Sequence, residues 1–504
     1  MSPLLFTAPP NISLKSRTPF LLKTETINKR NLVVALVVTA LFVVLNAFML
    51  KQNLIWLSLL PLVGLVGVLL VSRTETMLML MALLTPLAVD VAVLPGMELS
   101  MPVEPLMIAF TLLFLFRVLL NRDFDRRILV HPVSVAILAQ LSWMLLTACF
   151  SELPAVSFKY FAARLWFVVP FYFAAVQIFR RPGRIGQFFW CYAAGMLLVV
   201  VYATVKTLGN MGDLQVLHRV MCPFYNDHTA YGCVLGLFIP AAFYLVRRQG
   251  RLRRGWLWLL MVASLCLMFV GIFFSYSRAS WISVFAAIGV YVLIRLGMKV
   301  RWMVLMFALL IGGFFYYQSD VLYRLGKNKQ DSSLDLAGQL QSISNISTDA
   351  SNLERLNRWA SALRIFRENP VMGCGPGTYQ FVYASYQRSY QKSVISTDFG
   401  NRGNAHSEYI GPLCEQGVPG AVLVLCVFLV TFACGVRVYR SARDRGVADM
   451  ALAFTLSLLT YYVHGVFNNF LDTDKLSVPF WAFTAVIVSL DLYSRRPDSS
   501  LPEA

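Results

Sequence analysis

Two arginines, Arg355 and Arg358, are well suited to bind phosphate, because a guanidinium group offers two parallel hydrogen bonds to phosphate oxygens. They lie in the polar segment 319–416, which interrupts an otherwise apolar chain. Around them, a capping signature at Ser351–Glu354 and apolar residues at every third or fourth position predict a helix that ends at Asn369-Pro370. Residues three apart share one face of a helix. We therefore expect Arg355 and Arg358 to point in a similar direction.

His406 is the residue of the same segment best suited to proton transfer. It follows Asn404, a residue type that favours the N-cap, so we expect a helix that starts here and runs to Gly417. The positive end of a helix disfavours imidazolium, which would keep the ring neutral and able to accept a proton. The nearby Glu408 either orients this ring or only extends the helix cap, and the sequence leaves both readings open.

Four further basic residues are candidates for the same site. Arg278 lies at the outer junction of two expected spans, where it either binds phosphate or anchors the chain at the interface. Arg219 and His228 belong to the loop before another span and could line the same cavity, although ordinary loop polarity explains them nearly as well. Arg164 lies inside an apolar stretch, where a charge costs about 3 kcal/mol at mid-membrane, so it faces either protein or a water-filled cavity.

Two motifs resemble ligand sites but are weak. Asp472-Thr-Asp474 has the D-x-D pattern of many metal-binding nucleotide-sugar enzymes, yet it is short and falls on the expected outer face, away from nucleotide sugars. Gly373–Gly377 lacks the Lys-Ser/Thr that follows the glycines of a P-loop, so we interpret it as a tight turn. We therefore expect neither a metal nor a cofactor.

The composition places the chain in a lipid bilayer. Of its 504 residues, 58% are hydrophobic and 14% charged, whereas soluble domains are about 25% charged. A spanning helix needs about 20 apolar residues. We predict an all-α polytopic membrane protein with about 12–14 transmembrane helices and one large helical loop on the outer face. The fourteen expected spans are 32–49, 54–71, 76–95, 105–121, 132–150, 156–178, 186–207, 229–246, 256–274, 280–297, 302–318, 417–436, 449–468 and 477–492.

The placement of charge predicts the orientation of these spans. The net charge of +18 comes mainly from the termini and alternate short loops, while the intervening loops are acidic or neutral. This alternation is the positive-inside pattern, and it argues against nucleic-acid binding. It predicts a cytoplasmic leader at 1–31, spans 1–11 in 32–318, an outer loop at 319–416, spans 12–14 in 417–492 and a cytoplasmic tail at 493–504.

Most of the nine cysteines fall inside expected spans, where they act as small apolar residues. Cys222, Cys374 and Cys414 fall on the expected outer side. A disulfide between two of these three is compatible with the sequence, but no pattern in the sequence selects a pair.

The order of several motifs is similar to that of the O-antigen ligase and O-antigen polymerase superfamily. The motifs lie between residues 223 and 420, and the residues before them are similar only in forming hydrophobic spans. They are Ser277-Arg-Ala-Ser-Trp281, Arg355-x-x-x-Trp359, Asn369-Pro-Val-Met-Gly-Cys-Gly-Pro-Gly-Thr-Tyr379, Asn404-Ala-His-Ser-Glu408 and Glu415-Gln-Gly-Val-Pro-Gly420.

The resemblance implies a bacterial inner-membrane glycosyltransferase of the C type, which moves a glycan from undecaprenyl diphosphate to a hydroxyl on the periplasmic side without a metal. It implies that Arg278 and Arg355 bind the diphosphate and that His406 is the essential histidine. Arg358 is an additional candidate that the resemblance does not demand. The chain departs from the family in its higher number of expected spans, and in Ser407-Glu408 where many members have Asn after the histidine.

The expected partners are an undecaprenyl-diphosphate-linked glycan as donor, lipid A–core or a glycan as acceptor, and membrane lipids. A polymerase of O-antigen or exopolysaccharide would use the same donor chemistry and stays open as an alternative to the ligase. A flippase for lipid-linked oligosaccharides is the alternative from another class. A flippase is expected to carry repeat-related halves and charges in a central cavity, whereas this chain places about a hundred polar residues outside one leaflet.

Overall fold

The structure is a computed structural model, and it describes residues 29–51, 64, 67–69, 72–94, 97–120, 124–210, 214–306, 309, 350–389 and 403–494. The chain divides into two compact units, residues 1–69 and 70–504. The first unit contributes α1 (Lys29–Lys51), an apolar helix with Lys51 in its last turn.

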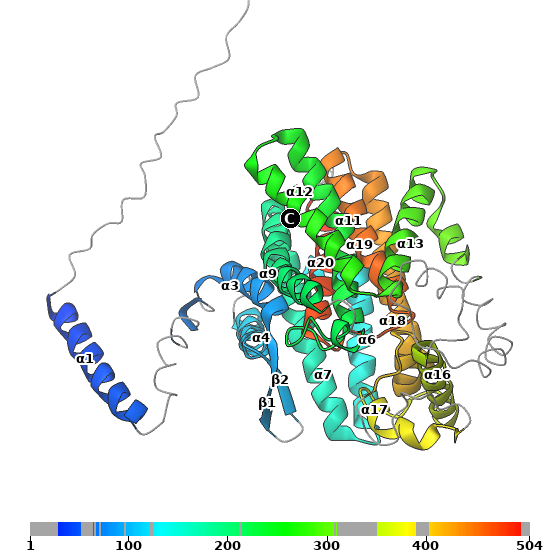
Figure 1. Cartoon of the computed structure of the whole chain (residues 1–504), viewed down its shortest axis with the longest axis horizontal. Helices are drawn as coiled ribbons and strands as arrows, with labels where there is room; N and C mark the ends of the chain where they lie inside the picture. Colours follow the sequence, from blue (N-terminus) through cyan, green and yellow to red (C-terminus); the bar gives the residue numbers. More distant parts are fainter. Residues whose placement is uncertain are drawn as a thin grey trace, which may run out of the picture. The chain divides into compact units, whose positions relative to one another are not determined.

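The second unit is built almost entirely of helices (Figure 1). Its long helices are uniformly apolar or carry a wide apolar face, which is the pattern of elements buried in lipid or in protein. In chain order its helices are α3 (Thr74–Leu84), α4 (Val103–Leu120), α5 (Arg127–Val130), α6 (Pro132–Cys149), α7 (Pro154–Val168), α8 (Ala175–Phe179), α9 (Pro182–Gly209), α10 (Leu214–Leu217), α11 (His228–Leu252), α12 (Trp256–Phe274), α13 (Arg278–Arg295), α16 (Ala350–Glu368), α17 (Tyr379–Val382), α18 (Ile410–Ser441), α19 (Arg445–His464) and α20 (Asp474–Tyr493).

Within the described residues, 10 helices are long and apolar enough to cross a membrane. They confirm the predicted class, an all-α polytopic membrane protein. They correspond to ten of the fourteen expected spans, and α7, a π-helical stretch at Val169–Ala174 and α8 together make one of them. Of the other four expected spans, 32–49 falls within α1, while 54–71 and 302–318 lie largely outside the described residues.

The prediction of a span at 76–95 is wrong. Helix α3 gives way to a 3-10 turn at Thr85–Leu87, and the chain then forms β1 (Val89–Leu94), which pairs antiparallel with β2 (Met97–Met101). Pro86 lacks an N–H and cannot continue the helix ladder. The following Val-Asp-Val-Ala-Val run is rich in β-branched residues, which favour an extended backbone.

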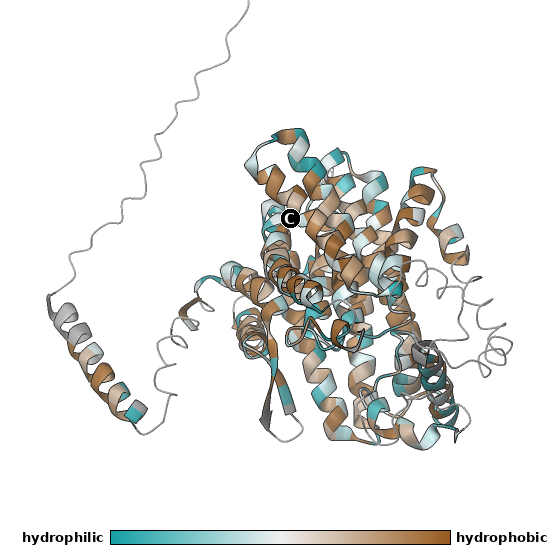
Figure 2. Ribbon diagram, viewed as in Figure 1, coloured by the Kyte–Doolittle hydropathy of each residue, from teal (hydrophilic) through white to brown (hydrophobic). Residues whose placement is uncertain are grey.

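Helix α20 lies at the centre of the second unit, and it packs against α18 and α19 (Figure 1). Its residues are buried along almost the whole length from Asp474 to Asp491. The apolar residues dominate the long helices, whereas hydrophilic residues gather on α16 and at the ends of the helices (Figure 2). The core therefore consists of α20 surrounded by other apolar helices.

The loops gather at two ends of the helices. At the end that carries α16, the N–H of Glu152 donates to the C=O of Cys374 (3.1 Å), and Arg164 donates to the C=O of Leu471 (2.9 Å). At the other end, basic side chains pair with acidic ones, as Arg184 does with Glu75. We call these the α16 end and the basic end. The positive-inside rule predicts that the basic end faces the cytoplasm.

Candidate functional site

Helix α16 brings the two arginines of the polar segment to the helical domain. Its bounds agree with the helix predicted from the capping signature and Asn369-Pro370. The face that carries Leu356, Trp359, Ala362 and Ile365 is buried in an apolar cluster shared with the start of α18. This packing fixes the rotation of α16 and therefore the direction of each arginine.

Arg355 reaches from α16 to the connection between α19 and α20. Its Nε donates a hydrogen bond to the C=O of Phe467 (3.2 Å), and its side chain is partly buried. Its charge also acts on His406, because it lowers the pKa of that ring. Arg355 therefore lies within electrostatic reach of the candidate base.

His406 lies in a turn ahead of α18, with a φ of 49°. Its N–H donates to Oδ1 of Asn404 (3.1 Å), and its C=O accepts from Nε1 of Trp359 (3.4 Å). The prediction that Asn404 caps a helix is wrong, because α18 begins only at Ile410 and Asn404 instead closes the turn on His406. A non-glycine residue at this φ is uncommon, and such strained residues gather at functional sites.

The imidazole of His406 is neutral at physiological pH. Burial, followed by the charges of Arg355 and Arg358, lowers its pKa to about 3, while Asp227 and Glu354 act in the opposite direction. A neutral ring is the state expected from the sequence, but its main cause is burial and not a helix terminus. The influence of Asp227 also shows that the start of α11 approaches this site.

Arg358 has a different environment from Arg355. Its Nε pairs with Oε1 of Glu354 (2.8 Å), and both side chains are buried. Its Nη1 donates to the C=O of Asn404 (3.2 Å), and its guanidinium lies over the ring of Tyr383, 5.0 Å from the centroid. These contacts hold the turn before His406 against α16. Arg358 thus has the contacts of a positioning residue.

Glu408 connects the start of α18 to the segment between α19 and α20. One carboxylate oxygen accepts the N–H groups of Phe470 and Leu471 (both 2.9 Å) and the hydroxyl of Tyr461. The N–H of Glu408 donates to the C=O of Gly465 (2.8 Å). The carboxylate therefore binds backbone groups of this connection, a role that neither reading of the sequence included.

We expect Glu408→Ala to destabilise the protein, because the buried N–H of Leu471 loses its acceptor and the N–H of Phe470 keeps only the hydroxyl of Tyr461 (3.2 Å). A buried N–H that loses its acceptor costs about 1–3 kcal/mol. Thermal unfolding of the purified protein in detergent measures the effect, and Glu408→Gln, which keeps one acceptor oxygen, should lie between wild type and Glu408→Ala. Equal unfolding temperatures for Glu408→Ala and wild type would contradict this role.

Arg278 is the first residue of α13, and α11 supports the turn that precedes it. Nδ1 of His228 is hydrogen-bonded to the C=O of Ser275 (2.9 Å), and the next residue, Tyr276, has a φ of 49°. The ring of His228 also stacks on His218, with centroids 4.4 Å apart. Asp227, the residue directly before α11, acts electrostatically on His406. The structure places Arg219 in the neighbouring turn with its side chain exposed.

Arg164 and the D-x-D motif take part in packing contacts at the α16 end. Arg164 is buried, and it donates to the C=O of Leu471 (2.9 Å) and to the hydroxyl of Tyr160 (3.0 Å). Asp474 pairs with Lys475 (3.0 Å), while Asp472 is exposed. Among the described residues, these two carboxylates belong to no group arranged to hold a metal ion.

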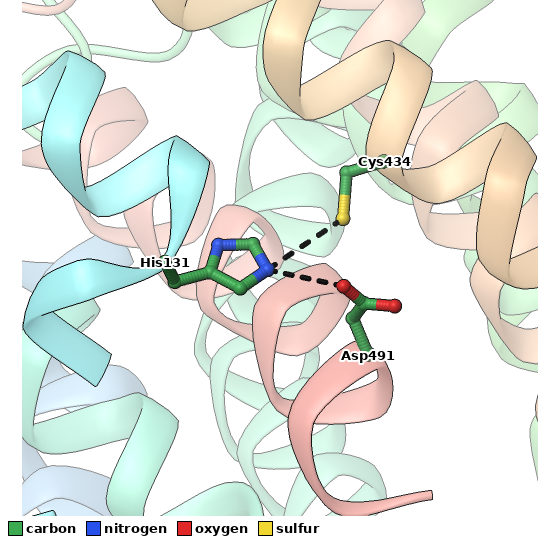
Figure 3. Close-up of side chains that lie close together, drawn as sticks. All are labelled: His131, Cys434 and Asp491. Atoms are coloured by element: carbon green, nitrogen blue, oxygen red, sulfur yellow. Dashed lines mark hydrogen bonds and ion pairs between the residues drawn. The ribbon is translucent and has the colours of Figure 1, made fainter. Parts of the chain in front are cut away.

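A cluster that the sequence did not reveal lies at the basic end (Figure 3). Nε2 of His131, just ahead of α6, lies 3.2 Å from Oδ2 of Asp491 on α20 and 3.9 Å from Sγ of Cys434 on α18. Such a group has donor atoms that suit a metal ion. However, Nδ1 of His131 accepts the N–H of Val133 (3.3 Å), which assigns the proton to Nε2 as a donor to Asp491. Arg437 donates to the same oxygen (2.7 Å). The cluster is therefore a hydrogen-bonded clamp between three helices.

We expect this clamp to stabilise the protein without a metal. Asp491→Ala removes the shared acceptor of His131 and Arg437, and should lower the free energy of unfolding by about 1–3 kcal/mol. Thermal unfolding with and without a chelator measures both points. A lower unfolding temperature of the wild type in chelator would show instead that the cluster holds a metal.

The fold is that of a multi-pass membrane protein, and Arg355 and His406 lie within electrostatic reach of each other at its α16 end. Residues 263–425 match the family model O-antigen ligase. This match covers about a third of the chain, includes Arg278, Arg355 and His406, and confirms the resemblance to the O-antigen ligase superfamily. The family indicates a membrane enzyme of the O-antigen ligase or polymerase type. No curated protein matches the chain.

Proposed function

We propose that the protein is a glycosyltransferase of the bacterial inner membrane. It moves a glycan from undecaprenyl diphosphate to an acceptor hydroxyl at the periplasmic face, and the acceptor is lipid A–core. The observation that carries this proposal is the neutral, partly buried imidazole of His406 within electrostatic reach of Arg355, inside the segment that matches the family. In this proposal the α16 end faces the periplasm, and the basic end, where α20 ends, faces the cytoplasm, because the basic end follows the positive-inside rule.

The arginines supply the charge that the departing group requires. When the bond between sugar and diphosphate breaks, negative charge builds up on the diphosphate, and fixed cations stabilise that charge most in the transition state. At an effective dielectric of about 20, one cation at about 4 Å from a unit charge contributes roughly 4 kcal/mol before desolvation. Arg278 and Arg355 together would therefore perform the task that a divalent metal performs in other transferases.

His406 supplies the base. Its neutral ring takes the proton of the acceptor hydroxyl while that oxygen attacks the anomeric carbon, and the simplest course is inversion. A pKa of about 3 describes a weak base in the absence of donor. A diphosphate bound at Arg355 would offset one of the positive charges that lower this pKa. Donor binding would therefore make His406 a stronger base at the time when a base is needed.

This effect of the donor on the pKa of His406 predicts that kcat and kcat/KM fall at different pH values on the acidic side of their pH profiles, their acid limbs. His406 must be deprotonated, so both kcat and kcat/KM should fall as the pH falls through its pKa. Because the donor raises that pKa, kcat should fall at a higher pH than kcat/KM, which reports the free enzyme. Initial rates between about pH 2 and pH 8 test this order. Superimposable limbs would contradict an effect of the donor on His406.

Reconstitution of the full-length protein in liposomes tests the proposed function itself. The protein receives a purified undecaprenyl-diphosphate-linked glycan together with lipid A–core, and the products are separated by gel and mass spectrometry. Glycan on lipid A–core supports the ligase. A ladder of longer lipid-linked chains would replace the ligase by a polymerase, and movement of intact donor across the bilayer without transfer would indicate a flippase.

A further inference from the structure

We propose that Cys374 and Cys414 form a disulfide bond in the mature protein. Cys374 lies in the glycine-rich turn after α16, and Cys414 lies in the first part of α18. The sequence offered three cysteines on the expected outer side and no means to choose among them. The structure distinguishes this pair from Cys222.

A backbone hydrogen bond joins the two residues directly. The N–H of Cys374 donates to the C=O of Cys414 (3.0 Å), and the N–H of Gly375 donates to the C=O of Glu415 (2.9 Å). Neighbours joined in this way have Cα atoms within the range of about 4.4–6.8 Å that a disulfide spans. The fold therefore brings together two cysteines that are forty positions apart in the sequence.

The glycines of the turn make this approach close. Gly373 has a φ of 68°, and a Cβ placed there would lie 2.3 Å from the carbonyl carbon of Glu415. A side chain at this position would push the turn away from α18. The backbone of Cys374 is thus held against α18 by the shape of the turn and by the two hydrogen bonds.

Both side chains are buried in one apolar cluster, with exposed fractions of 1% for Cys374 and 0% for Cys414. In the structure they are free thiols. Sγ of Cys374 accepts from Oγ1 of Thr378 (3.1 Å), and Sγ of Cys414 donates to the C=O of Gly411 (3.1 Å). These are weak hydrogen bonds. A disulfide would replace both of them when the two side chains rotate toward each other.

The chemistry requires an oxidant, which we assign to a thiol–disulfide oxidoreductase of the outer compartment. The thiolate of one cysteine attacks the disulfide of that protein, and the second cysteine then displaces it from the mixed disulfide. The two cysteines lose two protons and two electrons, and the oxidoreductase leaves as a dithiol. Burial raises the pKa of Cys374 to about 12, and thiolates are the reactive form. The bond would therefore form before the segment is fully buried.

The bond would fix the turn after α16 to the start of α18, close to the segment that carries His406. The inference rests on one part of the proposed function, the placement of the α16 end outside the cytoplasm. It does not depend on the transfer reaction.

Differential alkylation of the full-length protein from bacterial membranes tests the inference. Free thiols are blocked with N-ethylmaleimide in denaturant, the protein is reduced, and newly exposed thiols are labelled with iodoacetamide before mass spectrometry. We expect seven of the nine cysteines to carry the first label, and Cys374 and Cys414 to carry only the second. A digest without reduction should contain the two peptides linked.

Single variants give matched controls. Cys374→Ser should expose Cys414 to the first label, and Cys414→Ser should expose Cys374. Cys426→Ser, within the membrane-spanning part of α18, should leave the pair linked. First label on both cysteines of the wild type, or a link from either to a third cysteine, would overturn the proposal. Normal glycan transfer by a protein that lacks the disulfide would leave the proposed function intact. A disulfide in a protein that does not transfer glycan would contradict only the proposed glycosyltransferase activity.

Discussion

Replacing His406 with alanine is expected to lower kcat for glycan transfer by about 10²–10⁴-fold, the usual contribution of a positioned general base. The loss should appear mainly in kcat, because the imidazole acts on the acceptor proton while the arginines bind the donor. The purified variant should still bind the lipid-linked donor. Single-turnover transfer with a labelled donor measures the rate of the chemical step.

The control is chemical rescue. The alanine variant leaves space where the ring lay, and added imidazole should restore part of the rate, more so at higher pH where imidazole is unprotonated. Thermal unfolding should show that the variant folds, because the contacts of His406 that hold the turn come from its backbone N–H and C=O. Transfer at the wild-type rate would remove His406 from the reaction.

The sequence predicted the helices that cross the membrane because long apolar runs leave little choice in a bilayer. Its failure at 76–95 has a local cause. Hydropathy is the same for a helix and a strand, and only Pro86 and the β-branched residues after it distinguish the observed turn and hairpin from a span. Hydrophobicity therefore predicted that the segment lies in apolar surroundings, but it did not predict whether its backbone is helical or extended.

The site was predicted in part. His406 and Arg355 were named from residue type and spacing, and the structure places them within electrostatic reach of each other. Arg358 was named only as an additional candidate beside Arg355, and helical spacing does not show which of the two packs inward. That choice depends on Glu354 and Tyr383, and only the fold brings the ring of Tyr383 over the guanidinium.

The same limit applies to contacts between distant segments. The sequence contains no sign that Glu408 accepts the N–H groups of Phe470 and Leu471, since these lie more than sixty positions away. His131 and Asp491 are separated by 360 positions. A histidine directly ahead of a proline that starts a helix was the one available signal for the clamp, and it suggests a cap and not a partner.

Arg355→Ala is expected to lower kcat by about 10²–10³-fold, the effect of removing one preorganised group that stabilises developing charge. Arg355→Lys should recover part of this loss, because it keeps the charge but not the planar fork that suits a diphosphate. In Arg355→Ala the acid limb of kcat/KM should also move to higher pH, because the charge that lowers the pKa of His406 is gone.

Arg358→Ala is the matched control, since it removes the same side chain three positions away on α16. It breaks the buried ion pair with Glu354, a change that costs up to about 3–5 kcal/mol of folding free energy. The main effect of Arg358→Ala should therefore be a lower unfolding temperature. The fraction of the variant that folds should still transfer glycan. Arg355→Ala should show the reverse, because the Arg355 side chain is only partly buried, whereas that of Arg358 is buried. Donor-dependent kcat and thermal unfolding, measured on both variants, separate the two roles. If Arg358→Ala were fully stable and inactive while Arg355→Ala transferred normally, the diphosphate contact would belong to Arg358.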